Sequence, residues 1–154
     1  MVTLSGSDFT PGSSVTFGGT PVSVTYVSAS QLTVVSPARA STGAVNVVVT
    51  TAYGTSSAGP SFTYTNAPTI STVSPGAGPL SGGTTVTIAG SGLTGASAVT
   101  FDGVAAASFT VNGDASITAV SPAGSAGNAV VRVTTVGGSD TGTFRYAAAP
   151  TISA

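Results

Sequence analysis

Hydrophobic and polar residues alternate in short runs along most of this chain. Within residues 85–89, Val86 and Ile88 fall on one face and threonines on the other, and residues 129–135 repeat the pattern. A period of two residues indicates a β-strand with one buried face. No long segment shows the period of an amphipathic helix, so we expect an all-β fold.

Turn residues separate the predicted strands. Asp102-Gly103 lies between two strand-like runs and predicts a tight hairpin turn, and Gly18-Gly19 holds the same place earlier in the chain. Asn112-Gly113 predicts another turn of this kind. Short strands with turn signals between them, spaced by about 8–12 residues, are typical of a β-sandwich.

Most of the sequence occurs twice. "VTLSGSDFTPGSSVTFGG" at residues 2–19 aligns with "VTIAGSGLTGASAVTFDG" at 86–103, and "FTYTNAPTIS" at 62–71 aligns with "FRYAAAPTIS" at 144–153. A period of about 82–85 residues is too long for a solenoid and suits one sandwich per copy. Six recurring aromatic residues are predicted to lie in the two cores: Phe17, Phe62, Tyr64, Phe101, Phe144 and Tyr146.

The two copies differ at their starts. "PTISTVSPGAGPLSGGT" precedes the strand at 85–89, whereas the first copy begins directly in the matching strand, at Val2 and Leu4. The first copy is therefore expected to lack its first strand. The end of the chain, "APTISA" at 149–154, has the sequence of the beginning of such a strand. We accordingly divide the chain into an incomplete domain at 1–66, a complete domain at 67–148, and the start of a further repeat, or a donor-like strand, at 149–154.

Three explanations of the missing strand are open. The chain is a segment cut from a longer repetitive protein, or the first domain tolerates the loss, or copies assemble by strand addition. In the third case the tail of one subunit, with Pro150 and Ile152, pairs with the open edge of the next, at Val2 and Leu4. Unpaired strand edges invite such pairing.

Charged residues are scarce in this sequence. It has three Arg and no Lys among 154 residues, a net charge of −1, and 5% charged residues in all. Binding to nucleic acid depends largely on Lys and Arg, so we expect no nucleic-acid partner. No apolar run approaches the roughly 18 residues of a membrane helix, so we expect no membrane insertion. Small net charge favours association between copies.

The residue types of most catalytic sites are missing. Without His, Cys or Lys, the chain cannot form a Ser-His-Asp triad, a thiolate metal site or a Schiff base. The aspartates are not shared between the copies, since Asp8 aligns with Gly92. Asp114 and Asn112 offer at most a weak calcium site, because calcium needs several oxygen ligands. We therefore expect no enzyme activity, no bound metal and no cofactor.

Tyr53 is the best candidate for ligand binding. It lies in the turn-like sequence "TAYGTSS" of the first copy and has no counterpart in the second. A sugar-binding face needs exposed aromatic rings, which offer an apolar face beside a polar group. The alternative is that Tyr53 is an ordinary exposed surface residue.

The segment "PTISTVSPGAGPLSGGTTVTIAGSGL" at 68–93 resembles the start of an IPT/TIG domain. The residues that match this family's opening pattern are Pro68, Ile70, Val73, Pro75, Gly78, Pro79, Gly82, Gly83, Thr84, Val86, Ile88, Gly90, Gly92 and Leu93. Later segments at 99–106, 117–123 and 130–146 match its other strands, so the resemblance covers nearly the whole chain. It implies two tandem immunoglobulin-like β-sandwiches, the first of them without its N-terminal strand.

The resemblance also bears on function. The chain lacks the basic loops of the family's DNA-binding domains and the cysteines of its receptor domains, and is more similar to bacterial members of surface and secreted proteins. It implies a non-catalytic structural or adhesive repeat module of a stalk, adhesin or filament, outside the cell or on the bacterial surface. Its partners would be neighbouring repeats or other copies. The alternative is a carbohydrate-binding accessory module of a secreted polysaccharide-acting enzyme, with a glycan as partner.

Overall fold

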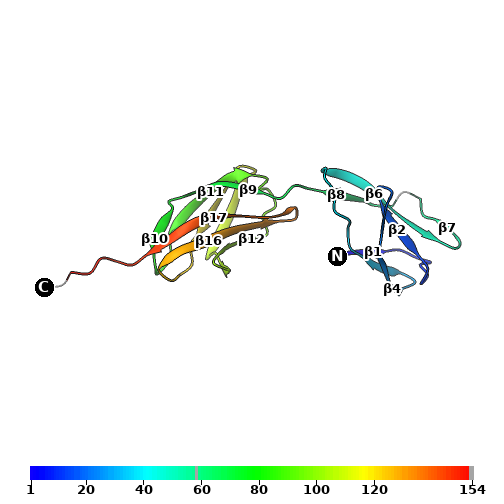
Figure 1. Cartoon of the computed structure of the whole chain (residues 1–154), viewed down its shortest axis with the longest axis horizontal. Coiled ribbons are helices and arrows are strands. Elements are labelled where there is room, and N and C mark those ends of the chain that lie inside the picture. The colour runs from blue at the N-terminus through cyan, green and yellow to red at the C-terminus, as the bar shows by residue number, and fades with distance from the viewer. Residues whose placement is uncertain (58, 153–154) are drawn as a thin grey trace. The chain divides into compact units, whose positions relative to one another are not determined.

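The structure, a computed structural model, describes residues 1–57 and 59–152. Within these ranges the regular elements are all β-strands, which confirms the all-β prediction (Figure 1). The strands form two compact units, Met1–Thr65 (unit 1) and Asn66–Ala154 (unit 2). No helix in the described part of the chain is long and apolar enough to cross a membrane.

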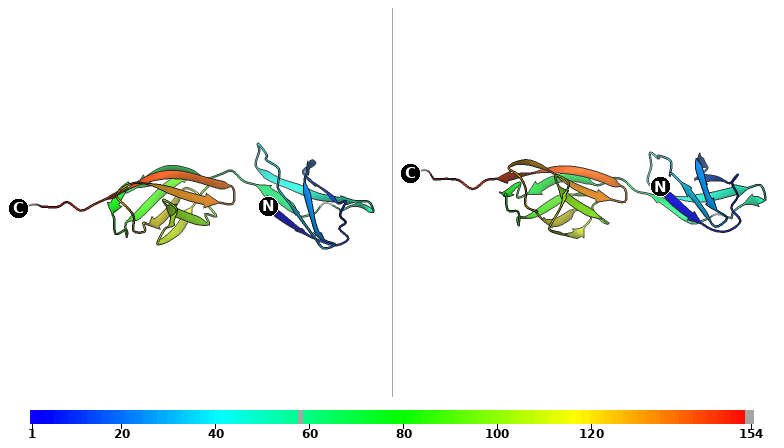
Figure 2. Two further views of the ribbon diagram at one scale, coloured as in Figure 1. Left: turned by 60° about the horizontal axis from the view of Figure 1, so that its bottom comes forward. Right: turned by 90° about the horizontal axis from the view of Figure 1, so that it is seen from below.

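Unit 2 is a sandwich of two sheets, whose layers can be followed in Figure 2. One sheet has the strand order β14-β15-β11-β9, with the bounds Ser108–Gly113, Ser116–Val120, Thr85–Ser91 and Thr69–Ser74. The other has the order β10-β17-β16-β12-β13, with the bounds Ala77–Pro79, Gly138–Ala147, Gly127–Thr135, Ala98–Phe101 and Val104–Ala105. Strand β10 pairs with β17 in parallel, and the other ladders of this unit are antiparallel.

Alternating side chains of both sheets fill the core of unit 2. The residues that the alternation placed on the buried face are fully buried: Val86, Ile88, Val131 and Val133. The Phe144 ring packs edge-to-face against Phe101, with 5.5 Å between ring centroids, and against Tyr146, with 5.1 Å. Arg145, between the two aromatic residues of β17, is exposed. The recurring aromatic residues of this unit are therefore core residues, as predicted.

Unit 1 repeats this plan with fewer strands. One sheet has the order β1-β5-β4, with the bounds Val2–Ser5, Gln31–Val34 and Val24–Ser28. The other has the order β3-β2-β6-β7, with β8 also paired to β6, and the bounds Thr20–Val22, Ser14–Phe17, Gly43–Thr51, Gly54–Thr55 and Ser61–Tyr64. Among the described residues, unit 1 has no strand in the place of β9, so it lacks the N-terminal strand as predicted.

The hairpin turn predicted at Asp102-Gly103 is confirmed. Both residues have positive φ, 48° and 83°, and they join β12 to β13. Gly18 and Gly19 hold the same place in unit 1, with φ of 55° and 87°. Positive φ at both central residues is the requirement of a type I′ hairpin turn, and aspartate accepts it better than most side chains.

The turn predicted at Asn112-Gly113 is wrong. These two residues end β14, and the turn lies one step later, at 114–115. The Asn112 side chain donates to Thr118 Oγ1 at 2.8 Å, and Gly113 pairs with Ser116 after a bulge in the strand. Contacts with the neighbouring strand thus hold the two residues in the sheet, against their preference for a turn.

Candidate functional site

The edge of β1 is where the two units differ most. In unit 2, β11 pairs with β15 on one side and with β9 on the other, where Gly90 lies opposite Ile70. In unit 1, β1 pairs with β5, and no strand of the described residues lies along its other side. The outer edge of β1 therefore presents backbone N–H and C=O groups that another strand can pair with.

The missing strand leaves part of the unit 1 core uncovered. Four unit 2 side chains have 0% exposure: Val86, Ile88, Leu93 and Val133. Their unit 1 counterparts in the sequence alignment are only half-buried: Val2, Leu4, Phe9 and Val49. Apolar surface in contact with water is unfavourable, so a strand that covered these side chains would be stabilised.

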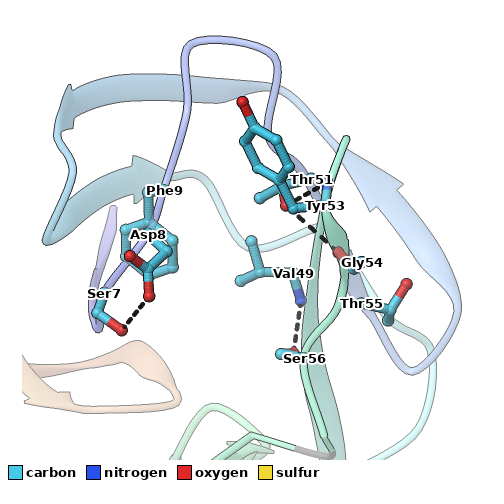
Figure 3. A pocket seen from close by; sticks show the side chains of 9 residues that line it. All are labelled: Ser7, Asp8, Phe9, Val49, Thr51, Tyr53, Gly54, Thr55 and Ser56. Atoms are coloured by element: carbon cyan, nitrogen blue, oxygen red, sulfur yellow. Dashed lines mark hydrogen bonds between the residues drawn. The ribbon is translucent and has the colours of Figure 1, made fainter.

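Two adjoining pockets lie where the strand is missing. The first has a volume of about 260 Å³, and its lining includes Asp8, Phe9, Tyr53 and Gly54 (Figure 3). The second has a volume of about 320 Å³. Its lining includes residues of β1 and β6 and the segment just before β8: Leu4, Gly6, Val47, Gly59 and Pro60. Both pockets share Ser7, Phe9, Val49 and Ser56, and together we call them the β1 groove.

The residues just before β9 fill the space in unit 2 that corresponds to the first pocket. A Cβ atom on Gly138 would lie 3.0 Å from Ala67 Cβ, and one on Gly92 would lie 3.4 Å from Pro68 Cα. By alignment, Gly138 corresponds to Gly54 and Gly92 to Asp8, both of which line the first pocket. Pro68 itself is fully buried. An Ala-Pro pair is therefore what this part of the fold accommodates.

The hydrophobic residues of β9 fill the space that corresponds to the second pocket. A Cβ atom on Gly142 would lie 3.1 Å from Ile70 Cγ2 and 2.7 Å from Val73 Cγ2. Gly142 aligns with Pro60, which lines the second pocket. Ile70 and Val73 are both packed against the buried core of unit 2. The second pocket thus corresponds to the place of a β-branched side chain.

The predicted assembly residues fall into two groups. Val2 and Leu4 lie on β1 with half-buried side chains, and Leu4 lines the second pocket. Pro150 and Ile152 lie after β17 in a segment without regular structure, both exposed, and Ile152 is 99% exposed. A role of these four residues in assembly stays a prediction.

Tyr53, the predicted glycan contact, lies at the rim of the first pocket (Figure 3). It is 89% exposed, and its backbone N–H donates to Thr51 Oγ1 at 3.2 Å. A ligand in the first pocket could contact the Tyr53 side chain. An ordinary surface residue in a turn would have the same exposure, so both alternatives for Tyr53 stay open.

Three residues of the β1 groove were not predicted from the sequence: Phe9, Val49 and Ser56. Their counterparts in unit 2 are Leu93, Val133 and Asp140, which lie beneath or beside β9. Ser56 and Asp140 correspond because each pairs with the equivalent valine of the central strand, Val49 or Val133. For Phe9 and Val49 the alignment of the two copies contained a signal, since it pairs them with Leu93 and Val133 of the complete domain.

The aspartates hold turns and strand ends together. Asp102 Oδ1 accepts a hydrogen bond from the backbone N–H of Val130 at 2.6 Å. Asp114 Oδ2 accepts one from the backbone N–H of Gly92 at 3.1 Å. Asp140 Oδ2 accepts one from the backbone N–H of Ile70 at 2.7 Å. Hydrogen bonds from the backbone N–H groups of Ile70 and Thr141 lower the pKa of Asp140. The described residues contain no group of three or more His, Cys, Asp or Glu side chains that could hold a metal ion.

Comparison with known families gives one match, and it is found twice. The model of the IPT/TIG domain matches residues 1–64 and again residues 68–146. The two matches correspond to the two sandwiches. None of the curated proteins matches the sequence.

The chain is similar to several solved structures. The extracellular region of plexin A4 matches with a TM-score of 0.52 and 22% identity, over 87% of this chain and 14% of that one. SGBP-B of a mixed-linkage glucan utilization locus of Bacteroides ovatus, in complex with a heptasaccharide, has a TM-score of 0.43 and 20% identity, over 88% and 38%. SGBP-B of a xyloglucan utilization locus of Bacteroides uniformis has a TM-score of 0.47 and 21% identity, over 86% and 41%. The chain thus spans less than half the length of each of these proteins.

Proposed function

The chain belongs to the IPT/TIG domain family, and on that premise we propose that it is a non-catalytic structural repeat module of an extracellular bacterial stalk, adhesin or filament. One observation carries the proposal. Three of the four aspartates, Asp102, Asp114 and Asp140, accept hydrogen bonds from backbone N–H groups and so serve the fold. Because the sequence has no His, Cys or Lys, few groups are left for chemistry.

The strand pairing of unit 2 supports a load-bearing role. Strand β10 is close to the start of the unit and β17 is at its end, and the two run parallel with Ala77 opposite Arg145 and Pro79 opposite Ala147. A pull on the two ends of the unit acts first on β9, which precedes β10 and pairs with β11. Once β9 has detached, the pull slides β10 along β17, which loads the hydrogen bonds of that pair together. In unit 1 the described residues contain no parallel pair, so its two ends are held by antiparallel ladders alone.

Single-molecule pulling on the ends of the chain tests this role. We expect two unfolding steps, with unit 2 yielding at the higher force, because the rate of forced unfolding depends on the barrier to breaking the loaded pair. The longer step identifies unit 2, which has more residues. Each molecule carries both units, so unit 1 serves as the internal reference. Unfolding of unit 2 at a force no higher than that of unit 1 would contradict the load-bearing role.

A second candidate function is glycan binding, and the exposure of Tyr53 favours it. The ring is 89% exposed at the rim of a pocket of about 260 Å³, where a sugar ring could stack on it. If the chain binds a glycan here, Tyr53→Ala should weaken binding on a glycan array roughly fivefold or more, since a stacked aromatic ring contributes about 1 kcal/mol or more. Tyr26→Ala, at the other unshared tyrosine, is the matched control. Absence of binding to every glycan by the unchanged chain would rule this candidate out.

A further inference from the structure

We propose that the β1 groove receives residues Ala149–Ile152 of a second copy of this chain, with Pro150 in the first pocket and Ile152 in the second. This contact rests on the structural role proposed above, and it would join one copy of the module to the next. It starts from a repeat of sequence: "APTI" at 149–152 is identical to "APTI" at 67–70. In unit 2 the earlier segment fills the space that the groove leaves open in unit 1.

The groove matches this segment residue by residue. In unit 2, Thr69 lies opposite Ser91 and Ile70 opposite Gly90. Transferred to unit 1, this register places Thr151 of the second copy opposite Ser7 and its Ile152 opposite Gly6. Both Ser7 and Gly6 line the groove. The incoming segment would therefore extend the sheet at the free edge of β1 by antiparallel pairing.

The tail is available for this pairing. Residues 147–152 are exposed, and 148–152 are in no strand. At 99% exposure, Ile152 loses no contact when it enters the groove, so its burial gives a net apolar gain. The tail carries no charged side chain, and Asp8 is the charged side chain in the lining of the groove, so no pair of like-charged side chains opposes the approach.

Two features of the groove limit the affinity. A Cβ atom on Gly6 would lie 2.7 Å from Phe9 Cζ, whereas a Cβ atom on the equivalent Gly90 of unit 2 would meet the backbone of Thr69. The Phe9 ring thus occupies the place that the backbone of the paired strand takes in unit 2. The Phe9 ring must therefore turn aside when the strand enters. In addition, Ser56 stands where Asp140 accepts the backbone N–H of Ile70 in unit 2, and Ser56 Oγ already accepts the backbone N–H of Val49 at 3.1 Å. We expect association near millimolar concentration.

Sedimentation of the whole chain at concentrations up to about 1 mM tests the proposal. The unchanged chain should associate, and Ile152→Asp should remain monomeric. Because Ile152 is 99% exposed, its replacement leaves both sandwiches intact. Val136→Asp, at a residue 89% exposed and outside the groove, is the matched control and should associate like the unchanged chain.

Two substitutions in the groove make the test specific. Ser56→Asp should supply the carboxylate that receives Ile152 N–H and lower the dissociation constant roughly tenfold, as expected for a hydrogen bond to a charged acceptor. Gly6→Ala should abolish association, because its methyl group occupies the path of the incoming backbone. Hydrogen exchange of unit 1 reports whether each variant is folded.

The location of the contact can be read from amide signals in NMR spectra. A peptide with the sequence of residues 147–154 should shift the signals of Gly6, Ser7 and Val49, and the same peptide with Asp in place of Ile152 should not. Equal sedimentation of the unchanged chain and Ile152→Asp would overturn the proposal, as would protection of β1 that is independent of concentration. Either result would leave the mechanical role of unit 2 unaffected, because single-molecule pulling tests that role separately.

Discussion

Replacing Phe144 by alanine is expected to lower the free energy of unfolding of unit 2 by about 3–5 kcal/mol. Phe144 has 0% exposure and its ring lies between those of Phe101 and Tyr146, in edge-to-face contact with both. Alanine would leave a cavity between the sheets and remove both aromatic contacts. Hydrogen exchange of peptides from residues 85–147, measured against urea concentration, reports the stability of this unit separately from that of unit 1.

Phe62→Ala is the matched control in unit 1. Phe62 makes the equivalent edge-to-face contacts, at 5.2 Å from Phe17 and 5.0 Å from Tyr64, but it is only half-buried. We expect a loss of about 1–3 kcal/mol, because less apolar surface returns to water. If the two variants lost equal free energy of unfolding, the two cores would be equally well covered, contrary to the burial described above.

Replacing Gly90 by alanine is expected to detach β9 from unit 2 and to cost about 3 kcal/mol, at the upper end of the range for overpacking. A Cβ atom at this position would run into the carbonyl group of Thr69, which is backbone and cannot rotate away. Hydrogen exchange should show loss of protection at the amides of β9 and along the edge of β11, while β16 and β17 stay protected.

Gly6→Ala is the control for this substitution. The added Cβ atom meets the far end of the Phe9 side chain, at 2.7 Å from Cζ, and a half-buried ring can turn. We expect a loss of about 1 kcal/mol or less in unit 1, since an off-rotamer side chain costs about that much. A loss as large as that of Gly90→Ala would mean that the Phe9 ring is fixed in the groove, and the groove would then not admit a strand.

The sequence predicted the strands because their pattern is local. Val86 and Ile88 are two residues apart, and an alternating run indicates a strand with one buried face whichever strand lies beside it. The Asp102-Gly103 hairpin was likewise predictable, because both residues take positive φ within the turn itself. Asn112-Gly113 was predicted wrongly since the decisive contacts, to Ser116 and Thr118, come from the neighbouring strand.

The candidate site was predictable only in part. The unmatched start of the first copy predicted an open edge at Val2 and Leu4, because that inference needs only the alignment. The groove itself was not predicted, since Phe9, Val49 and Ser56 come together from separate strands and loops. Local pattern also gives no sign that the Tyr64 hydroxyl is buried without a hydrogen-bond partner among the described residues, whereas that of Tyr146 donates to Pro122 O at 2.7 Å.

The identity of residues 67–70 and 149–152 has a consequence for how the chain folds. While unit 2 is still unfolded, both segments are equally suited to the edge of β11, because nothing in their four residues tells one from the other. What distinguishes them is the sequence that follows: Val73 completes the hydrophobic face of β9, and β10 then pairs with β17. Correct folding of unit 2 thus depends on Val73 and β10, which follow the earlier segment, and we expect pairing with the segment of another chain to become more frequent as the protein concentration rises.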